Sequence, residues 1–114
     1  MSSLINKIHN PGPDIYYDRN FRIVFEDHLN HIINTSTSYI TNATIDPNTA
    51  ARYAGDWSGL MIELGIFPYM HWYNLRLNGL MSSSDFDGTM LSVSLLNSIV
   101  VEKLMNSYKT QRKN

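Results

Sequence analysis

The polypeptide has 114 residues, of which 43% are apolar and 17% charged, and its formal net charge is −1. This length supports one domain with a modest core, and the balanced charge without a basic block argues against nucleic-acid binding, which needs a phosphate-neutralising surface. The chain contains no cysteine, so disulfides, thiolate metal ligands and cysteine catalysis are excluded. Residues 1–10 lack the apolar core of an export signal, and no apolar run approaches the roughly 18 residues of a membrane span, so we expect neither secretion nor a membrane association.

Residues 1–17 predict an extended N-terminal arm. Within it, Asn10-Pro11-Gly12-Pro13-Asp14 sets two prolines around a glycine, which excludes a continuous helix. Ile15, Tyr16 and Tyr17 then supply apolar and aromatic anchors. Such an arm either lies over a neighbouring protein or covers its own domain, and the sequence leaves both interpretations open.

Residues 18–114 predict a single α+β domain that opens with a helix and a strand. Apolar residues recur at three- and four-residue steps across Asp18–Asn34, which is typical of an amphipathic helix. Asp18 is the expected N-cap of this helix. Thr37–Ile45 is rich in β-branched residues and includes Tyr39, so we expect a strand there.

A long second helix is expected after this strand. Asp46 as the cap and Pro47 at the first helical position start it, and its apolar pattern continues to about Leu64. Gly55 and Gly59 lie four residues apart on this helix, where each costs roughly 1 kcal/mol relative to alanine. Their presence predicts the close approach of another backbone.

The last part of the domain predicts a helix, a strand and a helix. The first helix covers Tyr69–Leu77, and a polar loop with Phe86 as its buried anchor follows it. Alternating side chains over Leu91–Leu95 predict a half-buried strand. Asn97 or Ser98 caps the final helix, whose expected apolar side is formed by Ile99, Val100, Lys103, Leu104 and Tyr108.

No combination of residues predicts catalysis. His28 and His31 share one helical face but lack a third ligand at a suitable spacing, so a solvated or capping pair is favoured. Asp85 and Asp87 lack the further oxygens and the distal glutamate of a calcium loop, which favours an Asx-turn. Ser58 has only the second glycine of a nucleophile elbow. We therefore expect no enzyme, no metal site and no cofactor.

The strand–helix–helix–strand order over about residues 39–96 resembles the βααβ core of LysM-type domains, and short motifs within it are similar too. Residues 49–56, Thr-Ala-Ala-Arg-Tyr-Ala-Gly-Asp, resemble the first-helix pattern in which alanine precedes Arg-Tyr-Gly. Residues 75–79, Leu-Arg-Leu-Asn-Gly, resemble the end of the second helix. His71-Trp72-Tyr73 is similar to the aromatic–Trp step of the LysM-like proteins in phage baseplate wedges. The chain departs from these patterns at Ala54 and in the long loop Met81–Gly88.

The resemblance implies a small LysM-like core, flanked by the arm, a helix before it and a C-terminal helix that pack against partners. It implies a structural subunit of a tailed-phage virion, at the baseplate, tail or head–tail junction. Such a subunit is assembled in the host cytoplasm, in several copies, with other virion structural proteins in a symmetric particle. The sugar-binding branch of the family gives the alternative, a module that recognises peptidoglycan or chitin through a groove near Asp46–Asn48 and Gly79–Ser83.

Aromatic side chains are the expected contacts in such an assembly, because Tyr and Trp are common anchors of protein interfaces. Packing in the chain's own core is the competing explanation for each of them, and it is at least as well supported for Trp57 and Trp72. The interface candidates are Tyr16, Tyr17, Trp57, Tyr69, Trp72 and Phe86.

Overall fold

The computed structural model describes residues 13–112, and the helices and the two-stranded sheet in this range confirm the α+β class. The α-helices are α2 Arg19–Thr35, α3 Pro47–Arg52, α4 Trp57–Glu63, α5 His71–Leu77 and α6 Ser98–Arg112. The strands are β1 Ile40–Thr44 and β2 Ser92–Leu96, and the short 3-10 helices are η1 Asp14–Tyr17, η2 Thr37–Tyr39, η3 Pro68–Met70 and η4 Ser83–Asp85. Residues 1–12 of the predicted arm lie outside the described residues.

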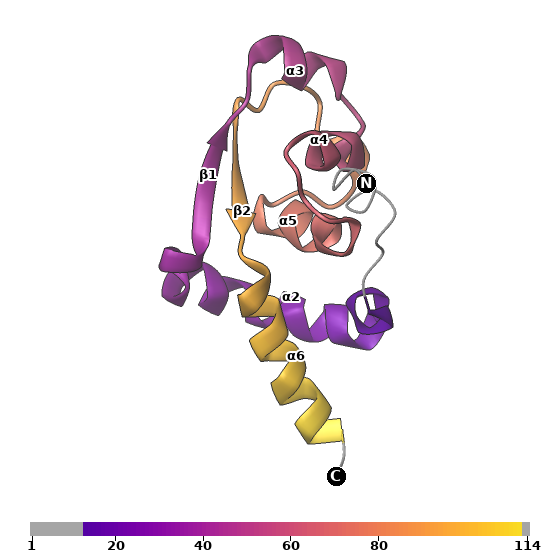
Figure 1. Cartoon of the computed structure of the whole chain (residues 1–114), viewed down its shortest axis with the longest axis vertical. Helices are drawn as coiled ribbons and strands as arrows, with labels where there is room; N and C mark the ends of the chain where they lie inside the picture. The colour runs from indigo at the N-terminus through magenta and orange to yellow at the C-terminus, as the bar shows by residue number, and fades with distance from the viewer. Residues whose placement is uncertain (1–12, 113–114) are drawn as a thin grey trace, which may run out of the picture.

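The elements are arranged along the strand pair (Figure 1). β1 and β2 stand side by side, α3 lies at one end of them, and α2 and α6 lie at the other end. α5 lies next to β2, and α4 lies beyond it towards α3. The helices α4 and α5 are therefore located between α3 and the pair α2 and α6.

The described end of the predicted arm is a 3-10 turn, not an extended segment. In η1, the side chain of Tyr16 is buried, and its carbonyl oxygen accepts a hydrogen bond from the hydroxyl of Tyr73 at 2.7 Å. This turn therefore covers its own domain, which was one of the two interpretations that the sequence left open.

The two strands pair antiparallel, with Ile40 opposite Leu96 and Thr44 opposite Ser92. β1 is shorter than the predicted strand because Thr37–Tyr39 forms η2 instead. In β2 the expected alternation holds at Val93, which is buried, but Leu91 is exposed and precedes the strand.

Asn74 of α5 and Asn78, the residue that caps the C-terminus of α5, occupy the edge of β2 that faces away from β1. The amide oxygen of Asn74 accepts from the N–H of Leu96 at 2.7 Å, and its NH₂ group donates to the carbonyl of Met70 at 3.0 Å. One turn later, the side chain of Asn78 accepts from the N–H of Ser94 at 2.7 Å and donates to the carbonyl of Ser94 at 2.8 Å. The amides of α5 thus replace a third strand.

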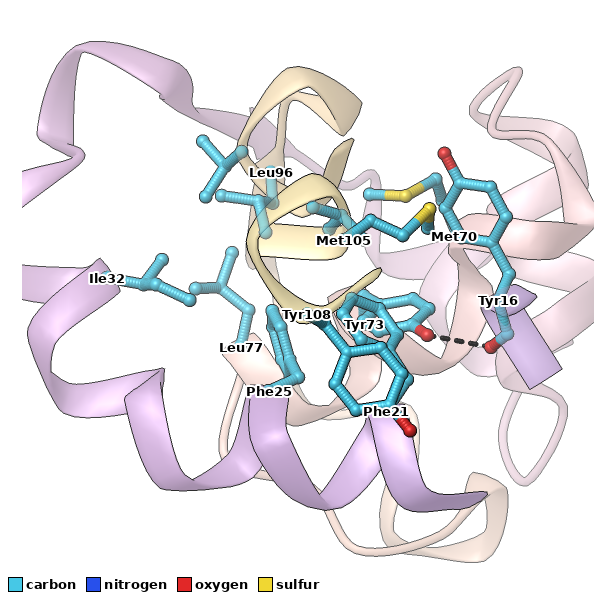
Figure 2. Close-up of a cluster of buried hydrophobic side chains, with 12 residues drawn as sticks. Tyr16, Phe21, Phe25, Ile32, Met70, Tyr73, Leu77, Leu96, Met105 and Tyr108 are labelled. Atoms are coloured by element: carbon cyan, nitrogen blue, oxygen red, sulfur yellow. Dashed lines mark hydrogen bonds between the residues drawn. The ribbon is translucent and has the colours of Figure 1, made fainter. Parts of the chain in front are cut away.

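The core consists of two clusters that share α5. The first joins η1, α2, α5 and α6 and is shown in Figure 2; it contains Tyr16, Phe21, Phe25, Ile32, Met70, Tyr73, Leu77, Leu96, Val100, Val101, Met105 and Tyr108. The second lies among α3, α4, α5 and the strands; it contains Ile45, Ala50, Trp57, Leu60, Met61, Leu75, Phe86 and Val93. The flanking helices, expected to pack against partners, therefore bury their main apolar faces within the chain.

The buried side of α6 differs from the expected one. Val101 and Met105 lie in the core beside the predicted Val100 and Tyr108, whereas Ile99 and Lys103 are exposed. Asn97 is the residue that caps this helix, because its side-chain oxygen accepts from the N–H of Ile99 at 3.0 Å.

The long helix predicted over residues 46–64 is broken between α3 and α4. Gly55 adopts a φ of +77° at the break, and its N–H donates to the carbonyl of Phe86 at 2.6 Å. Asp56 then caps α4 through the N–H of Gly59 at 2.9 Å. A Cβ at Gly59 would lie 2.3 Å from the carboxylate of Asp56, so the close neighbour is this capping side chain and not, as expected, another backbone.

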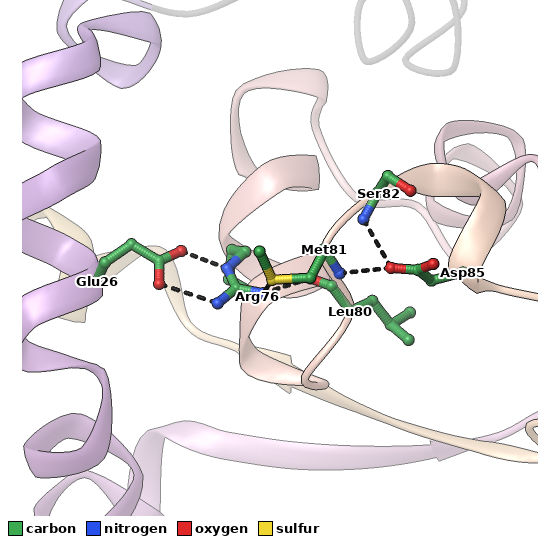
Figure 3. Close-up of polar contacts among 6 residues, drawn as sticks. All are labelled: Glu26, Arg76, Leu80, Met81, Ser82 and Asp85. Atoms are coloured by element: carbon green, nitrogen blue, oxygen red, sulfur yellow. Dashed lines mark hydrogen bonds and ion pairs between the residues drawn. The ribbon is translucent and has the colours of Figure 1, made fainter.

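An ion pair joins α2 to α5 near the start of the long loop (Figure 3). The guanidinium of Arg76 donates to both carboxylate oxygens of Glu26, and its Nη1 donates to the carbonyl of Leu80 at 2.6 Å. The carboxylate of Asp85 then accepts from the N–H groups of Met81 and Ser82 at 2.9 and 3.1 Å. These contacts fix the loop to the same helix that holds β2.

Substitution of Asn74 by leucine tests the amide contact with β2. Asn74→Leu conserves the size of the side chain but leaves the N–H of Leu96 without its acceptor in the core. An orphaned buried donor costs about 1–3 kcal/mol, so we expect the free energy of unfolding in urea to fall by about 2 kcal/mol or more. Asn30→Leu, at an exposed position of α2, is the control and should change it by less than about 0.5 kcal/mol. Equal effects of the two substitutions would contradict this role for Asn74.

Candidate interaction groove

The six aromatic residues proposed as interface contacts divide into core and surface. Tyr16, Trp57 and Phe86 are only 4%, 2% and 0% exposed, because they fill the two core clusters. Their burial is what core packing, the competing explanation for each of them, predicts, and their role as interface residues stays a prediction. Tyr69 and Trp72 are partly buried, and Tyr17 is 44% exposed.

The largest hollow described lies between the start of α2 and the pair α4–α5, with a volume of about 340 Å³. We call it the aromatic groove. Three of the six predicted interface residues line it. Its lining consists of Tyr17, Arg22, Trp57, Ser58, Pro68, His71, Trp72, Leu75 and Ser83.

Hydrogen bonds to Trp57 hold the floor of the aromatic groove in place. The indole N–H of Trp57 donates to the carbonyl of His71 at 2.9 Å, which ties α4 to α5. The backbone N–H of Trp57 donates to the hydroxyl of Ser83 at 2.8 Å, and this hydroxyl donates to the carbonyl of Gly55 at 2.9 Å. Ser83 therefore joins the long loop to the break between α3 and α4.

Arg22 forms the rim of the aromatic groove together with two aromatic rings. Its guanidinium carbon lies 4.7 Å from the ring centre of Trp72 and 5.6 Å from that of Tyr17, distances at which cation–π attraction operates. Its Nε donates to the carbonyl of Tyr16 at 3.2 Å. The cation is thus held in a fixed position at the mouth of the aromatic groove.

Tyr73 lies directly behind this rim and remains neutral. Burial raises the pKa of Tyr73 to about 12, although the nearby Arg22 acts in the opposite direction. Burial also raises the pKa of Tyr16 to about 12, with a smaller contribution from Glu102. Both hydroxyls therefore carry their protons at neutral pH, which suits Tyr73 to donate its hydrogen bond to η1.

His71 is buried beside the aromatic groove. One ring nitrogen, Nε2, lies 2.9 Å from the carbonyl of Ile66, which can only accept, so Nε2 carries a proton and donates. Burial lowers the pKa of His71, and the hydrogen bond to Ile66 opposes this effect. No carboxylate is among the residues that line the groove, so the pair Ser58 and His71 lacks the acidic third member of a hydrolase triad.

The other residues considered for chemistry lie elsewhere and are occupied structurally. His28 is exposed on α2, with its Nδ1 2.8 Å from the carbonyl of Val24. Asp85 holds the backbone of the long loop, and Asp87 accepts from the N–H and hydroxyl of Thr89 at 3.0 and 2.6 Å, an Asx-type turn as predicted. Within residues 13–112 no three His, Asp or Glu side chains converge as metal ligands, and no helix is long and apolar enough to cross a bilayer.

Sequence patterns did not single out Arg22, Ser83 or Asn74, whereas Asn78 belongs to the Leu-Arg-Leu-Asn-Gly motif. Arg22 and Ser83 carry no motif, since a lone charge on a helix and a serine in a polar loop are ordinary surface features. Asn74 did carry a signal: it lies between the apolar residues Tyr73 and Leu75 and four residues before a second amide, Asn78.

Compared with protein-family models, with curated proteins and with solved structures, the chain matches none of them. The geometry described above and the motif resemblance are therefore the basis for assigning a function.

Lowered proton affinity at His71 predicts a pH-dependent stability. In the folded chain the pKa of His71 lies below its ordinary value of 6.5. As the pH falls through 6.5, His71 therefore binds a proton in the unfolded chain but stays neutral in the folded chain, which favours unfolding. The free energy of unfolding should therefore decrease between about pH 7.5 and 5.5, as measured by urea denaturation. His71→Gln, which keeps a donor for Ile66 but cannot be protonated, should make this dependence shallower. An unchanged slope in the variant would contradict the assignment.

Proposed function

We propose that this chain is a structural subunit of a tailed-phage virion, at the baseplate, tail or head–tail junction, with a LysM-like βααβ middle region. The single observation that carries the proposal is that the motif residues act within one structural unit. Gly55 of the motif at residues 49–56 lies at the break between α3 and α4, Trp72 of His71-Trp72-Tyr73 forms the rim of the aromatic groove, and Asn78 of the motif at residues 75–79 bonds to β2. Residues that match a family pattern and together define the shape of the unit support the relationship.

Packing against other proteins is the mechanism that we propose. A standard interface buries about 1,600 Å² in total, and exposed or half-exposed aromatic and aliphatic side chains are its usual anchors. Trp72, Tyr69 and Arg22 offer such a surface on a rigid support, because each is fixed by contacts within the chain. No catalytic step and no cofactor is part of this proposal.

Carbohydrate binding is the alternative from the same family, and the aromatic groove has some of its chemistry, although of the residues predicted to form the sugar groove, Asp46–Asn48 and Gly79–Ser83, only Ser83 lines it. Two serine hydroxyls and an indole ring are typical sugar-contacting groups. However, the Trp72 ring is already surrounded. Its centre lies 4.7 Å from the guanidinium carbon of Arg22, 5.0 Å from the ring centre of Tyr73 and 5.8 Å from that of Phe25. A sugar would need an open ring face, so this crowding favours the packing role.

The native mass of the purified chain, considered with the genes that flank its own, tests the proposal. We expect a mass above the 13.1 kDa of a single chain at high concentration, and neighbouring genes for tail or capsid proteins. Multi-angle light scattering on a sizing column gives the mass. A monomer at every concentration, encoded among metabolic genes, would overturn the proposed function.

Titration with a chitin oligomer separates the two candidate functions. Calorimetry at millimolar ligand should show no heat of binding if packing is the function. Saturable heat that is lost in Trp72→Ala would instead support the carbohydrate-binding alternative. Ile23→Ala, at an exposed position of α2, provides the matched control for that variant.

A further inference from the structure

β1 presents an unpaired backbone edge. The contacts of β2 with Asn74 and Asn78 show that the backbone N–H and C=O groups of the even-numbered residues of β2 point away from β1. The hydrogen-bonded pairs of the sheet are therefore Ala43 with Val93 and Thr41 with Leu95. The backbone groups of Ile40, Asn42 and Thr44 therefore point outward. The N–H of Ile40 donates to the carbonyl of Thr37. Within residues 13–112, neither the N–H of Asn42 nor that of Thr44 donates a hydrogen bond.

The opposite edge of the sheet is closed. Asn74 and Asn78 already use the backbone groups of Ser94 and the N–H of Leu96, so no further strand can add beside β2. Among residues 13–112, the edge of the sheet that remains open is β1, which lies at the margin of the ribbon in Figure 1.

The open edge lacks the devices that keep edge strands apart. Natural proteins protect such edges with lysine, proline, inward-pointing charges or bulges. Residues 36–45, Ser-Thr-Ser-Tyr-Ile-Thr-Asn-Ala-Thr-Ile, contain no charged residue and no proline. Two copies of this segment can therefore approach each other without like-charge repulsion.

The pattern of available groups is self-complementary about Asn42. If two β1 strands pair antiparallel with Asn42 opposite Asn42, these two residues exchange two hydrogen bonds. The N–H of each Thr44 then reaches the carbonyl of Ile40 in the other copy, which adds one bond on each side. This register uses the unoccupied N–H groups of Asn42 and Thr44 and leaves aside the N–H of Ile40, which is already bonded, together with the carbonyl of Thr44 that it would have met. A register centred on Ile40 would place that occupied group at the axis.

We propose that β1 is the contact surface for a second copy of this chain, in an isologous antiparallel pairing about a two-fold axis at Asn42. The product is a four-stranded sheet with the order β2-β1-β1-β2. A hollow of about 300 Å³, lined by the apolar Ile33, Ile40 and Leu77 and the polar Thr37, Asn42 and Ser94, lies beside the strand and extends the contact. The inference rests on the assembly role proposed above and names the surface that one such contact uses.

A disulfide at the axis tests the pairing, because the chain has no cysteine of its own. In the proposed register, the two Cα atoms at position 42 are about 5.5 Å apart, within the roughly 4.4–6.8 Å that a disulfide spans. Mild oxidation of Asn42→Cys in the full chain should therefore give a covalent dimer as the main product on a non-reducing gel.

Thr44→Cys on the same exposed strand is the matched control. Its two copies would lie about 13 Å apart in the same dimer, because four residues of strand separate them. We expect roughly tenfold less dimer from this variant at equal concentration, since a disulfide cannot span that distance. Equal yields from the two variants, or no dimer from either, would overturn the pairing.

A charge at the axis gives a second, independent readout. Asn42→Lys sets two like charges opposite each other and should lower the average native mass relative to the unmodified chain. Asn30→Lys, on exposed α2, should leave it unchanged. A mass equally sensitive to both substitutions would contradict the edge contact.

The outcomes separate this inference from the proposed function. Self-association without cross-linking at position 42 would remove the β1 contact and leave the assembly role standing. Cross-linking at position 42 in a chain encoded among metabolic genes would retain the β1 contact and remove the virion assignment.

Discussion

The hydrogen bonds between the asparagines of α5 and the edge of β2 are the contacts on which the rest of the structure depends. A pair of five-residue strands is marginal by itself, since isolated hairpins are barely stable in water. Asn74 and Asn78 supply the partners that a third strand would provide, and they do so from a helix whose other positions reach two separate cores. One element thus satisfies the backbone of the sheet and also supplies the apolar surface that packs against the neighbouring helices.

Because α5 is shared, the flanking helices are part of the domain. Tyr73 and Leu77 contact the cluster formed with α2 and α6, whereas Leu75 belongs to the cluster formed with α4 and the strands. Removal of α2 or α6 would expose one side of the central helix. Residues 39–96 alone would therefore lack the side chains that α2 and α6 contribute to the first cluster, such as the fully buried Phe21 and Phe25 of α2.

Sequence periodicity predicted helices that have one continuous apolar face, but it failed where a polar contact determines where a helix ends. α2 and its cap Asp18 were predicted within a residue, because Phe21 and Phe25 repeat at the helical spacing. The break at Gly55 was missed, since the apolar pattern continues across it and only the carbonyl of Phe86, 31 residues further along the chain, explains the turn. Aromatic type alone also failed to separate surface from core, because large rings fill a small core as readily as they anchor an interface.

The difference between the two sheet edges determines what kind of assembly this fold permits. A sheet with both edges open would allow strands to add on either side and would form filaments. Here the side-chain amides of Asn74 and Asn78 close one edge of the sheet, so within residues 13–112 the proposed pairing through β1 would use the edge that remains open in each copy. If β1 pairs as proposed, growth of the sheet stops at two copies, and a larger assembly would need other surfaces such as the aromatic groove. The proposed subunit would then combine one self-limiting contact with one groove for different neighbours, which is what a finite symmetric particle requires of its parts.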